Sequence, residues 1–260
     1  MYPILTRLGP FFIYSYTAVF AAGLFLSWIV TQRHPLAHKC PDWTNAALTA
    51  LIFGWVGARA SFVLLNWGYY AERPSEISQL WQGGLTAYGA LGAGLLGLWL
   101  WSRWRKQLAP SKEWGPFLPY ATLFSPALFL LIISGWAACW FEGCAYGAET
   151  VLGPFAADLP DSFGVFAVRY QTQILGIFLN LALLGFTLWQ QKRWGNGRLF
   201  PITLLIANLI HFGLTFLRGD AIIMLAGWRV DSWLALLFVI LALFLLQSNN
   251  YERRHHLPLN

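Results

Sequence analysis

Long apolar stretches dominate the pattern of hydrophobic and polar positions along this chain. Seven of them approach the roughly 20 residues that a helix needs to cross the hydrocarbon core of a bilayer. They lie near residues 11–31, 43–67, 84–101, 117–140, 172–190, 200–217 and 232–247, and charged or Gly/Pro-containing segments separate them. The pattern predicts an all-α integral membrane protein, a bundle of about seven transmembrane helices that forms a single domain over residues 1–260.

The composition of the chain agrees with this interpretation. Of its 260 residues, 57% are hydrophobic and 11% are charged, and the mean hydropathy is +0.53. These values lie outside the range of soluble globular domains, so we expect little mass outside the bilayer. The three cysteines are too few for a disulfide scaffold and lack the paired spacing of a zinc site, so neither a metal nor a cofactor is expected.

Lysine and arginine residues are distributed unevenly between the connections, and cytoplasmic connections of membrane proteins carry the excess. The connections after the first, third, fifth and seventh spans hold eleven of them: Arg33, Lys39, Arg103, Arg105, Lys106, Lys112, Lys192, Arg193, Arg198, Arg253 and Arg254. The opposite side holds five: Arg7, Arg73, Arg169, Arg218 and Arg229. The pattern predicts an outside N terminus and a cytoplasmic C terminus. The net charge of +6 then reflects topology, with no nucleic-acid partner.

A few ionisable side chains fall within or beside the predicted spans, although such a group costs at least about 2.5 kcal/mol at the bilayer centre on insertion scales. They are Arg59, Glu142, His211, Arg218 and Asp220. The predicted topology places all of them in the outer half of the membrane. They are interpreted as a polar pocket in which Arg59 and Arg218 bind a lipid phosphate. The alternative is that Arg218 and Asp220 anchor the interface, Arg59 snorkels and His211 bonds a neighbouring carbonyl.

Glycines mark the entrance to the third span. Gly83 and Gly84 favour an irregular turn with exposed backbone amides, which is a candidate anion site before a helix. Gly89, Ala93 and Gly97 follow at intervals of four and share one helix face. Small residues in this spacing favour close packing against another helix.

Glycines also interrupt the end of the fourth span, in residues 135–147. Irregular backbone at this depth must line a cavity or be buried in protein. Cys139 and Cys144 lie five residues apart in this segment. They are close enough for a disulfide, but packing as simple thiols is the favoured interpretation.

These segments, taken in order, resemble the bacterial prolipoprotein diacylglyceryl transferase family over most of the chain. The matching pieces are Leu8-Gly-Pro with Tyr14 and Tyr16, Gly57-Ala-Arg59, Trp81 to Gly89, the glycines Gly135, Gly143 and Gly147, Thr172-Gln173, and Phe216 to Asp220. The resemblance implies transfer of the diacylglyceryl group of phosphatidylglycerol to the cysteine thiol of a prolipoprotein signal peptide, with release of glycerol phosphate. It implies a multi-pass protein of the bacterial cytoplasmic (inner) membrane that acts at the outer leaflet.

The resemblance also suggests which residues form the site. Arg59 and Arg218 are expected to bind the phosphate, with the Gly83 and Gly84 amides nearby, because the leaving group needs cationic or amide donors. Tyr16 is expected to contact lipid. Glu142, at the edge of the same pocket, is a further candidate for substrate binding.

The sequence departs from the family at several motif positions. Tyr88 replaces a histidine, Trp136 an arginine, Cys139 an asparagine, Cys144 a glutamate, His211 an arginine and Thr215 a glutamate. His211 is the candidate general base, because imidazole titrates near the required pH. Tyr88 is the alternative catalytic candidate; its unperturbed pKa is about 10, so it is expected only to orient substrate unless Arg59 lowers that pKa.

Two other functions are weighed against the transferase. A non-catalytic relative that binds lipid in the same pocket would explain the replaced family residues. A small-molecule transporter is disfavoured, because the sequence shows neither two matching hydropathy halves nor paired charges at mid-membrane.

Overall fold

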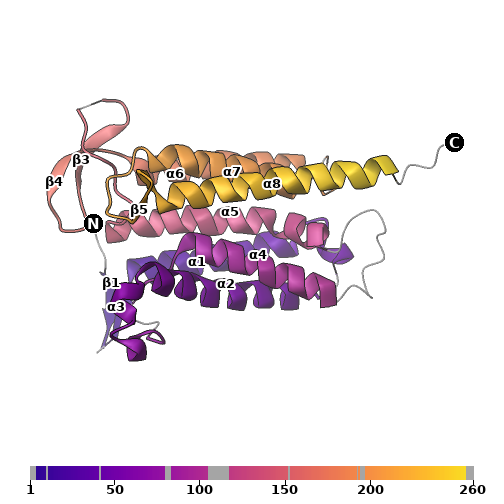
Figure 1. The fold of residues 1–260 in the computed structure, drawn as a ribbon, viewed down its shortest axis with the longest axis horizontal. Helices are drawn as coiled ribbons and strands as arrows, with labels where there is room; N and C mark the ends of the chain where they lie inside the picture. The colour runs from indigo at the N-terminus through magenta and orange to yellow at the C-terminus, as the bar shows by residue number, and fades with distance from the viewer. Residues whose placement is uncertain are drawn as a thin grey trace. The chain divides into compact units, whose positions relative to one another are not determined.

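The structure, a computed structural model, describes residues 4–9, 11–40, 42–79, 83–104, 117–151, 153–191, 193 and 197–255 (Figure 1). These residues form eight α-helices, two short 3-10 helices and three two-stranded β-sheets. They divide into two compact units. The first unit contains the described residues within 1–34 and 124–254, and the second contains those within 35–123 together with His255.

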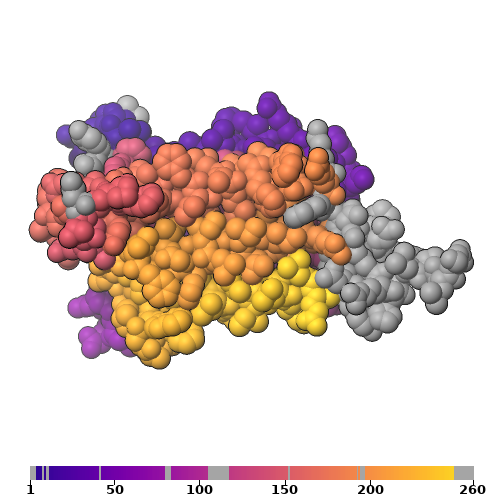
Figure 2. Space-filling view, turned by 90° about the horizontal axis from the view of Figure 1, so that it is seen from above, coloured from indigo at the N-terminus to yellow at the C-terminus, as the bar shows by residue number. Residues whose placement is uncertain are grey.

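Five long helices build the first unit. They are α1 (Ser15–Gln32), α5 (Phe117–Glu142, whose first turns belong to the second unit), α6 (Thr172–Gln190), α7 (Leu199–Thr215) and α8 (Val230–His255). The core is apolar where Phe129 of α5 meets Leu183 and Leu184 of α6, with side chains of α7 packed against them. Ser27 of α1 donates to the Ala127 carbonyl of α5 at 3.1 Å. Figure 2 shows α6, α7 and α8 side by side along their length.

Three antiparallel hairpins also belong to the first unit. They are β1 (Ile4–Leu8) with β2 (Phe11–Tyr14), β3 (Ala156–Pro160) with β4 (Phe166–Tyr170), and β5 (Met224–Leu225) with β6 (Trp228–Arg229). The β3–β4 and β5–β6 hairpins lie at the same end of α5 to α8 (Figure 1). The connection between α5 and α6 therefore contains the β3–β4 hairpin.

The second unit is centred on α2 (Trp43–Leu65) and α4 (Ala87–Trp104), which are antiparallel. A Cβ on Gly57 would lie 2.8 Å from the Gly89 carbonyl oxygen, and one on Gly97 would lie 2.7 Å from the Phe53 side chain. The predicted close packing of the small residues on α4 is therefore confirmed, with α2 as the partner. A short helix, α3 (Trp67–Tyr70), and the 3-10 helix η2 (Pro74–Glu76) lie in the connection, and η1 (Ala37–Lys39) precedes α2.

The helices are those of an integral membrane protein. Within the described residues, α1, α2, α5, α6 and the Val230–Ser248 part of α8 are long and apolar enough to cross a bilayer. The apolar α7 has 17 residues and is shorter, and α4 is not among the five. The first predicted span began too early, because residues 11–14 form β2. Arg105, Lys106, Lys112 and Lys192 lie outside the described residues, as do Trp81 and Gln82.

Candidate functional site

Arg59 lies in the last two turns of α2, with 5% of its surface exposed. Its guanidinium points at the connection between α2 and α4. Nε donates to the Ile77 carbonyl at 2.9 Å. Nη1 donates to the carbonyls of Gly83 and Gly84 at 2.7 and 3.3 Å. Nη2 donates to the carbonyls of Glu76 and Gln79 at 2.7 and 3.4 Å. Arg59 therefore contacts backbone oxygens from two parts of the α2–α4 connection, residues 76–79 and residues 83–84.

Gly83 and Gly84 form the irregular turn that the sequence predicts. Their φ angles are +80° and +77°, in the left-handed region that favours glycine. A Cβ on Gly84 would lie 2.9 Å from Nη1 of Arg59 and 2.5 Å from the Phe62 ring, so a larger residue would displace both groups. The contacts seen here use the glycine carbonyls. The anion site predicted for the amides remains a prediction.

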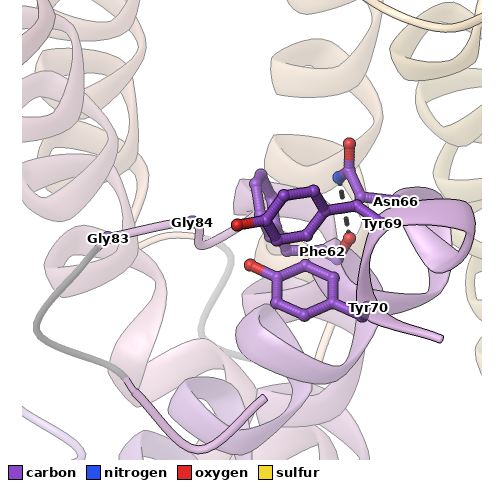
Figure 3. Close-up of a pocket in the computed structure, with 6 residues that line it drawn as sticks. All are labelled: Phe62, Asn66, Tyr69, Tyr70, Gly83 and Gly84. Carbon is purple, nitrogen blue, oxygen red and sulfur yellow. Dashed lines mark hydrogen bonds between the residues drawn. The ribbon is translucent and has the colours of Figure 1, made fainter. Parts of the chain in front are cut away.

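A pocket of about 290 Å³ opens beside this turn. Its lining consists of Phe62, Asn66, Tyr69, Tyr70, Gly83 and Gly84 (Figure 3). The hydroxyl groups of Tyr69 and Tyr70 both point toward the side on which Gly84 lies. The Tyr69 hydroxyl donates to Glu76 at 2.8 Å, and this hydrogen bond to a carboxylate raises the pKa of Tyr69. The pocket thus combines apolar ring faces with phenolic and peptide groups.

Thr86 caps the first turn of α4, on which Tyr88 lies half-buried. The Thr86 hydroxyl accepts from the Gly89 amide at 3.2 Å and is hydrogen-bonded to the Ser61 hydroxyl of α2. The Thr86 amide donates to the Ala58 carbonyl at 3.1 Å. The start of α4, and with it Tyr88, is consequently held against α2 next to Arg59.

Arg218 belongs to a four-membered ion-pair network in the first unit. Its Nε and Nη2 atoms bind both oxygens of Asp220 at 2.8 and 2.6 Å, and its Nη1 binds Asp231 at 2.9 Å. Arg229 bridges the same two carboxylates at 3.2 Å each. Arg229 and Asp231 are not among the predicted site residues, because their partners depend on the chain reversal at the β5–β6 hairpin. Two cations and two anions leave the network with no formal net charge.

Cys139 and Cys144 form a disulfide, so the prediction of simple packing thiols was wrong and the alternative is confirmed. The cause is the backbone after α5. The helix ends at Glu142, and Gly143 takes a φ of +81° that turns the chain back. The amides of Gly143 and Cys144 then both donate to the Cys139 carbonyl, at 2.8 and 3.1 Å.

The segment after the disulfide lies between two other parts of the first unit. On one side, Gly147 pairs with Arg218 as an isolated β-bridge, and the Gly219 amide donates to the Tyr146 carbonyl at 2.9 Å. On the other side, the Tyr170 amide donates to the Ala148 carbonyl at 3.2 Å. This segment couples the backbone at Arg218 to strand β4.

The first two residues of α6 also hold this segment in place. Thr172 donates through its hydroxyl to the Ala145 carbonyl at 2.6 Å, and Gln173 donates through its amide to the Cys144 carbonyl at 2.9 Å. Both side chains are buried. The Thr172-Gln173 pair, noticed in the sequence as a family motif, thus fixes the backbone next to the disulfide.

The remaining candidates are dispersed over the first unit. His211 on α7 is half-buried, with its ring centre 6.0 Å from that of Trp136 on α5. Tyr16, the second residue of α1, is 39% exposed and stacks on Phe20 at 6.3 Å. Glu142 is exposed at the end of α5. The structure thus brings His211 to Trp136 in this unit, and Arg59 to Gly83 and Gly84 in the other. The joint role predicted for Arg59 and Arg218 remains a prediction.

These features define a class: a multi-pass membrane protein whose apolar helices carry clusters of arginine, glycine and hydroxyl-bearing residues near their ends. The sequence matches the family described as prolipoprotein diacylglyceryl transferase over residues 3–248, and the chain belongs to that family. This confirms the family resemblance.

Relatives in several bacteria have similar sequences, and each carries the name phosphatidylglycerol–prolipoprotein diacylglyceryl transferase. The protein of Streptococcus mutans is 29% identical, and the alignment covers 98% of this chain and 97% of the relative. The protein of Lactococcus lactis subsp. cremoris is 28% identical, with 93% and 92% covered. The protein of Corynebacterium efficiens is 28% identical, with 90% and 77% covered.

Proposed function

We propose that the protein transfers the diacylglyceryl group of phosphatidylglycerol to the cysteine thiol of a prolipoprotein signal peptide. The observation that carries this proposal is the family match over residues 3–248, which includes both units and all of the candidate site residues. The names and the near-complete coverage of the bacterial relatives support it. A non-catalytic lipid-binding relative is the less favoured alternative.

The reaction forms a carbon–sulfur bond and breaks the bond between the glyceryl carbon and its phosphate oxygen. The electron pair of that bond leaves with glycerol phosphate, and the thiol proton passes to a base. We assign the base to His211, because its imidazole lies beside Trp136 of α5 in the first unit. Arg218 faces the departing phosphate in this proposal, and it must exchange part of its contact with Asp220 to do so.

The other candidates bind or orient substrate in this proposal. Tyr88 orients the acceptor or the lipid from the first turn of α4. Tyr16 contacts lipid from the start of α1, where its ring is exposed, and Glu142 contacts substrate from the end of α5. Gly83 and Gly84 contribute backbone to the wall of the pocket.

The proposal places the reaction at the outer face of the bacterial cytoplasmic membrane, with seven spans, an outside N terminus and a cytoplasmic C terminus. The excess of lysine and arginine on the opposite side supports this orientation. The Cys139–Cys144 disulfide also supports it, because disulfides persist outside the reducing cytosol. The disulfide follows α5 on the side assigned to the outside.

The test is an assay of the purified protein in detergent micelles that contain phosphatidylglycerol and a peptide with the lipoprotein signal motif. The expected result is release of glycerol phosphate together with a diacylglyceryl mass gain on the peptide cysteine. An active family member serves as the positive control, and a peptide with serine in place of cysteine as the negative one. Measurable phospholipid binding without turnover would overturn the proposal in favour of the lipid-binding alternative.

A further inference from the structure

The contacts of Arg59 exhaust what a guanidinium can donate. An arginine side chain carries five N–H donors: one on Nε and two on each Nη. The structure directs one bond from Nε and two from each Nη at five different backbone carbonyls. A substrate phosphate would therefore have to displace loop carbonyls in order to bind this side chain.

The surroundings of Arg59 also compensate its charge. Its guanidinium carbon lies 5.3 Å from the centre of the Tyr70 ring and 5.9 Å from that of Phe62. Ring faces and carbonyl oxygens are both electron-rich, so they stabilise a buried cation without a carboxylate. These carbonyls and ring faces together stabilise the buried positive charge of Arg59.

The groups that Arg59 contacts are also those that shape the pocket. The pocket is lined by Phe62, Tyr70, Gly83 and Gly84, among others. Arg59 also binds the Glu76 carbonyl, and the Glu76 carboxylate accepts a hydrogen bond from the Tyr69 hydroxyl. The Gly83–Gly84 turn leads directly into the Thr86 cap of α4 and hence into Tyr88. The guanidinium connects the two halves of the α2–α4 connection at this point.

We propose that Arg59 is a positioning residue, which holds the backbone of residues 76–79 and 83–84 so that the aromatic pocket and the first turn of α4 take their places, and which does not itself bind the substrate phosphate. The consequence for activity rests on the proposed transferase function, whereas the consequence for structure does not. The two are therefore tested separately.

Arg59→Lys separates the two possible roles. Lysine keeps the positive charge but donates from a single nitrogen, so it cannot reach carbonyls on both sides of the connection. If Arg59 positions the connection, Arg59→Lys is as damaging as Arg59→Gln. If Arg59 binds phosphate by charge, Arg59→Lys retains a substantial part of the activity and Arg59→Gln does not.

The structural readout is hydrogen–deuterium exchange of the purified full-length protein in detergent. We expect the amides of Thr86 and Gly89 to exchange about tenfold faster or more in both Arg59 variants, as expected when hydrogen bonds from a charged donor are lost. Arg73→Lys and Arg73→Gln are the matched controls. Arg73 lies in the same connection and stacks on Tyr69 at 4.4 Å, and its variants are expected to exchange at these amides like the wild type.

The activity readout is the transfer rate at varied phosphatidylglycerol concentration. We expect equal losses of kcat/KM in Arg59→Lys and Arg59→Gln, with accelerated exchange in both. The proposal would be overturned if exchange is unchanged in both variants and the KM for the lipid is raised in Arg59→Gln but close to the wild-type value in Arg59→Lys. An inactive wild type would refute the transferase function, and the exchange experiment would still decide the role of Arg59.

Gly84→Ala tests the same contact if both Arg59 variants fail to fold. Alanine leaves the Arg59 charge intact, but its Cβ would intrude at 2.9 Å from Nη1 and its backbone would be strained at a φ of +77°. Accelerated exchange confined to the α2–α4 connection and the start of α4 supports the proposal. Exchange at Thr86 and Gly89 equal to that of the wild type would overturn it.

Discussion

Nη1 of Arg218 lies 2.9 Å from Oδ2 of Asp231, although the two residues are 13 positions apart. Arg218 follows the end of α7, and Asp231 lies in the first turn of α8. The β5–β6 hairpin reverses the chain between them and brings the first turn of α8 back to the end of α7. Ser232 adds a hydrogen bond of 2.8 Å to Thr215 at the same junction. Asp231 thus fixes both the orientation of Arg218 and the approach of two helices.

Asp231→Asn is expected to destabilise the protein by about 3–5 kcal/mol, because it removes one anion from a buried network and leaves excess positive charge. The measurement is the thermal unfolding midpoint in detergent. Asp158→Asn, on the exposed surface of β3, is the matched control and is expected to have a midpoint within about 1 °C of the wild type. Equal midpoints for the two variants would show that the network contributes little to stability.

Removing the disulfide with the double substitution Cys139→Ser and Cys144→Ser is expected to lower stability by about 2 kcal/mol, the chain-entropy value for so short a loop. The transfer rate should fall as well, because the following segment pairs with the backbone at Arg218. Thermal unfolding with and without reductant measures the first effect. Reductant should lower the midpoint of the wild type and leave that of the double variant unchanged. A reductant effect of equal size in both would contradict this prediction.

Cys40→Ser is the control for that experiment, since Cys40 is the remaining cysteine and is a buried free thiol. Burial raises the pKa of the Cys40 thiol to about 12, so its thiolate is scarce at neutral pH. Alkylation of the folded wild type at pH 8 should therefore leave all three cysteines unmodified. Two modified cysteines without reductant would show that the Cys139–Cys144 bond is absent.

His34 gives the stability a dependence on pH. Burial lowers the pKa of His34 to about 4, whereas the unfolded chain protonates near 6.5. Between these values the unfolded state binds more protons, so stability is present above about pH 6.5 and is lost as the pH falls toward 4. The unfolding midpoint should fall less between pH 7.5 and pH 5 in His34→Gln than in the wild type. The exposed His38 supplies the control, since His38→Gln should keep the full dependence.

The sequence predicts the helices of this protein better than it predicts the polar contacts. The apolar stretches predict the helix ends to within about four residues, because the length and composition of a span are local properties of the chain; the exception is α8, which continues to His255 beyond the apolar stretch. The packing face of Gly89, Ala93 and Gly97 followed from helical periodicity for the same reason. The first span was placed too early, because the apolar residues 11–14 pair as a strand with β1.

The polar contacts were less accessible to sequence reasoning. Arg59 was recognised as an ionisable residue in a span, but its partners are backbone carbonyls, which every residue has and no pattern reveals. The disulfide depends on the positive φ of Gly143, and the Arg218 network depends on the β5–β6 reversal. In each case the deciding quantity is a backbone angle or a chain reversal, while the residue types fit other arrangements equally well.

The assignment of His211 as the base leads to the last prediction. His211→Ala should reduce kcat by about 10²-fold or more, the usual contribution of a positioned base, while the KM for phosphatidylglycerol changes little. If His211 accepts the thiol proton, raising the pH should partly restore the variant, because more of the peptide thiol, with a pKa near 8.5, is then already a thiolate. Arg218→Ala provides the contrast. It lacks the cation that faces the phosphate, so raising the pH should not restore its activity. Full activity in His211→Ala across pH 7 to 9 would exclude His211 as the base and leave Tyr88 as the residue to test next.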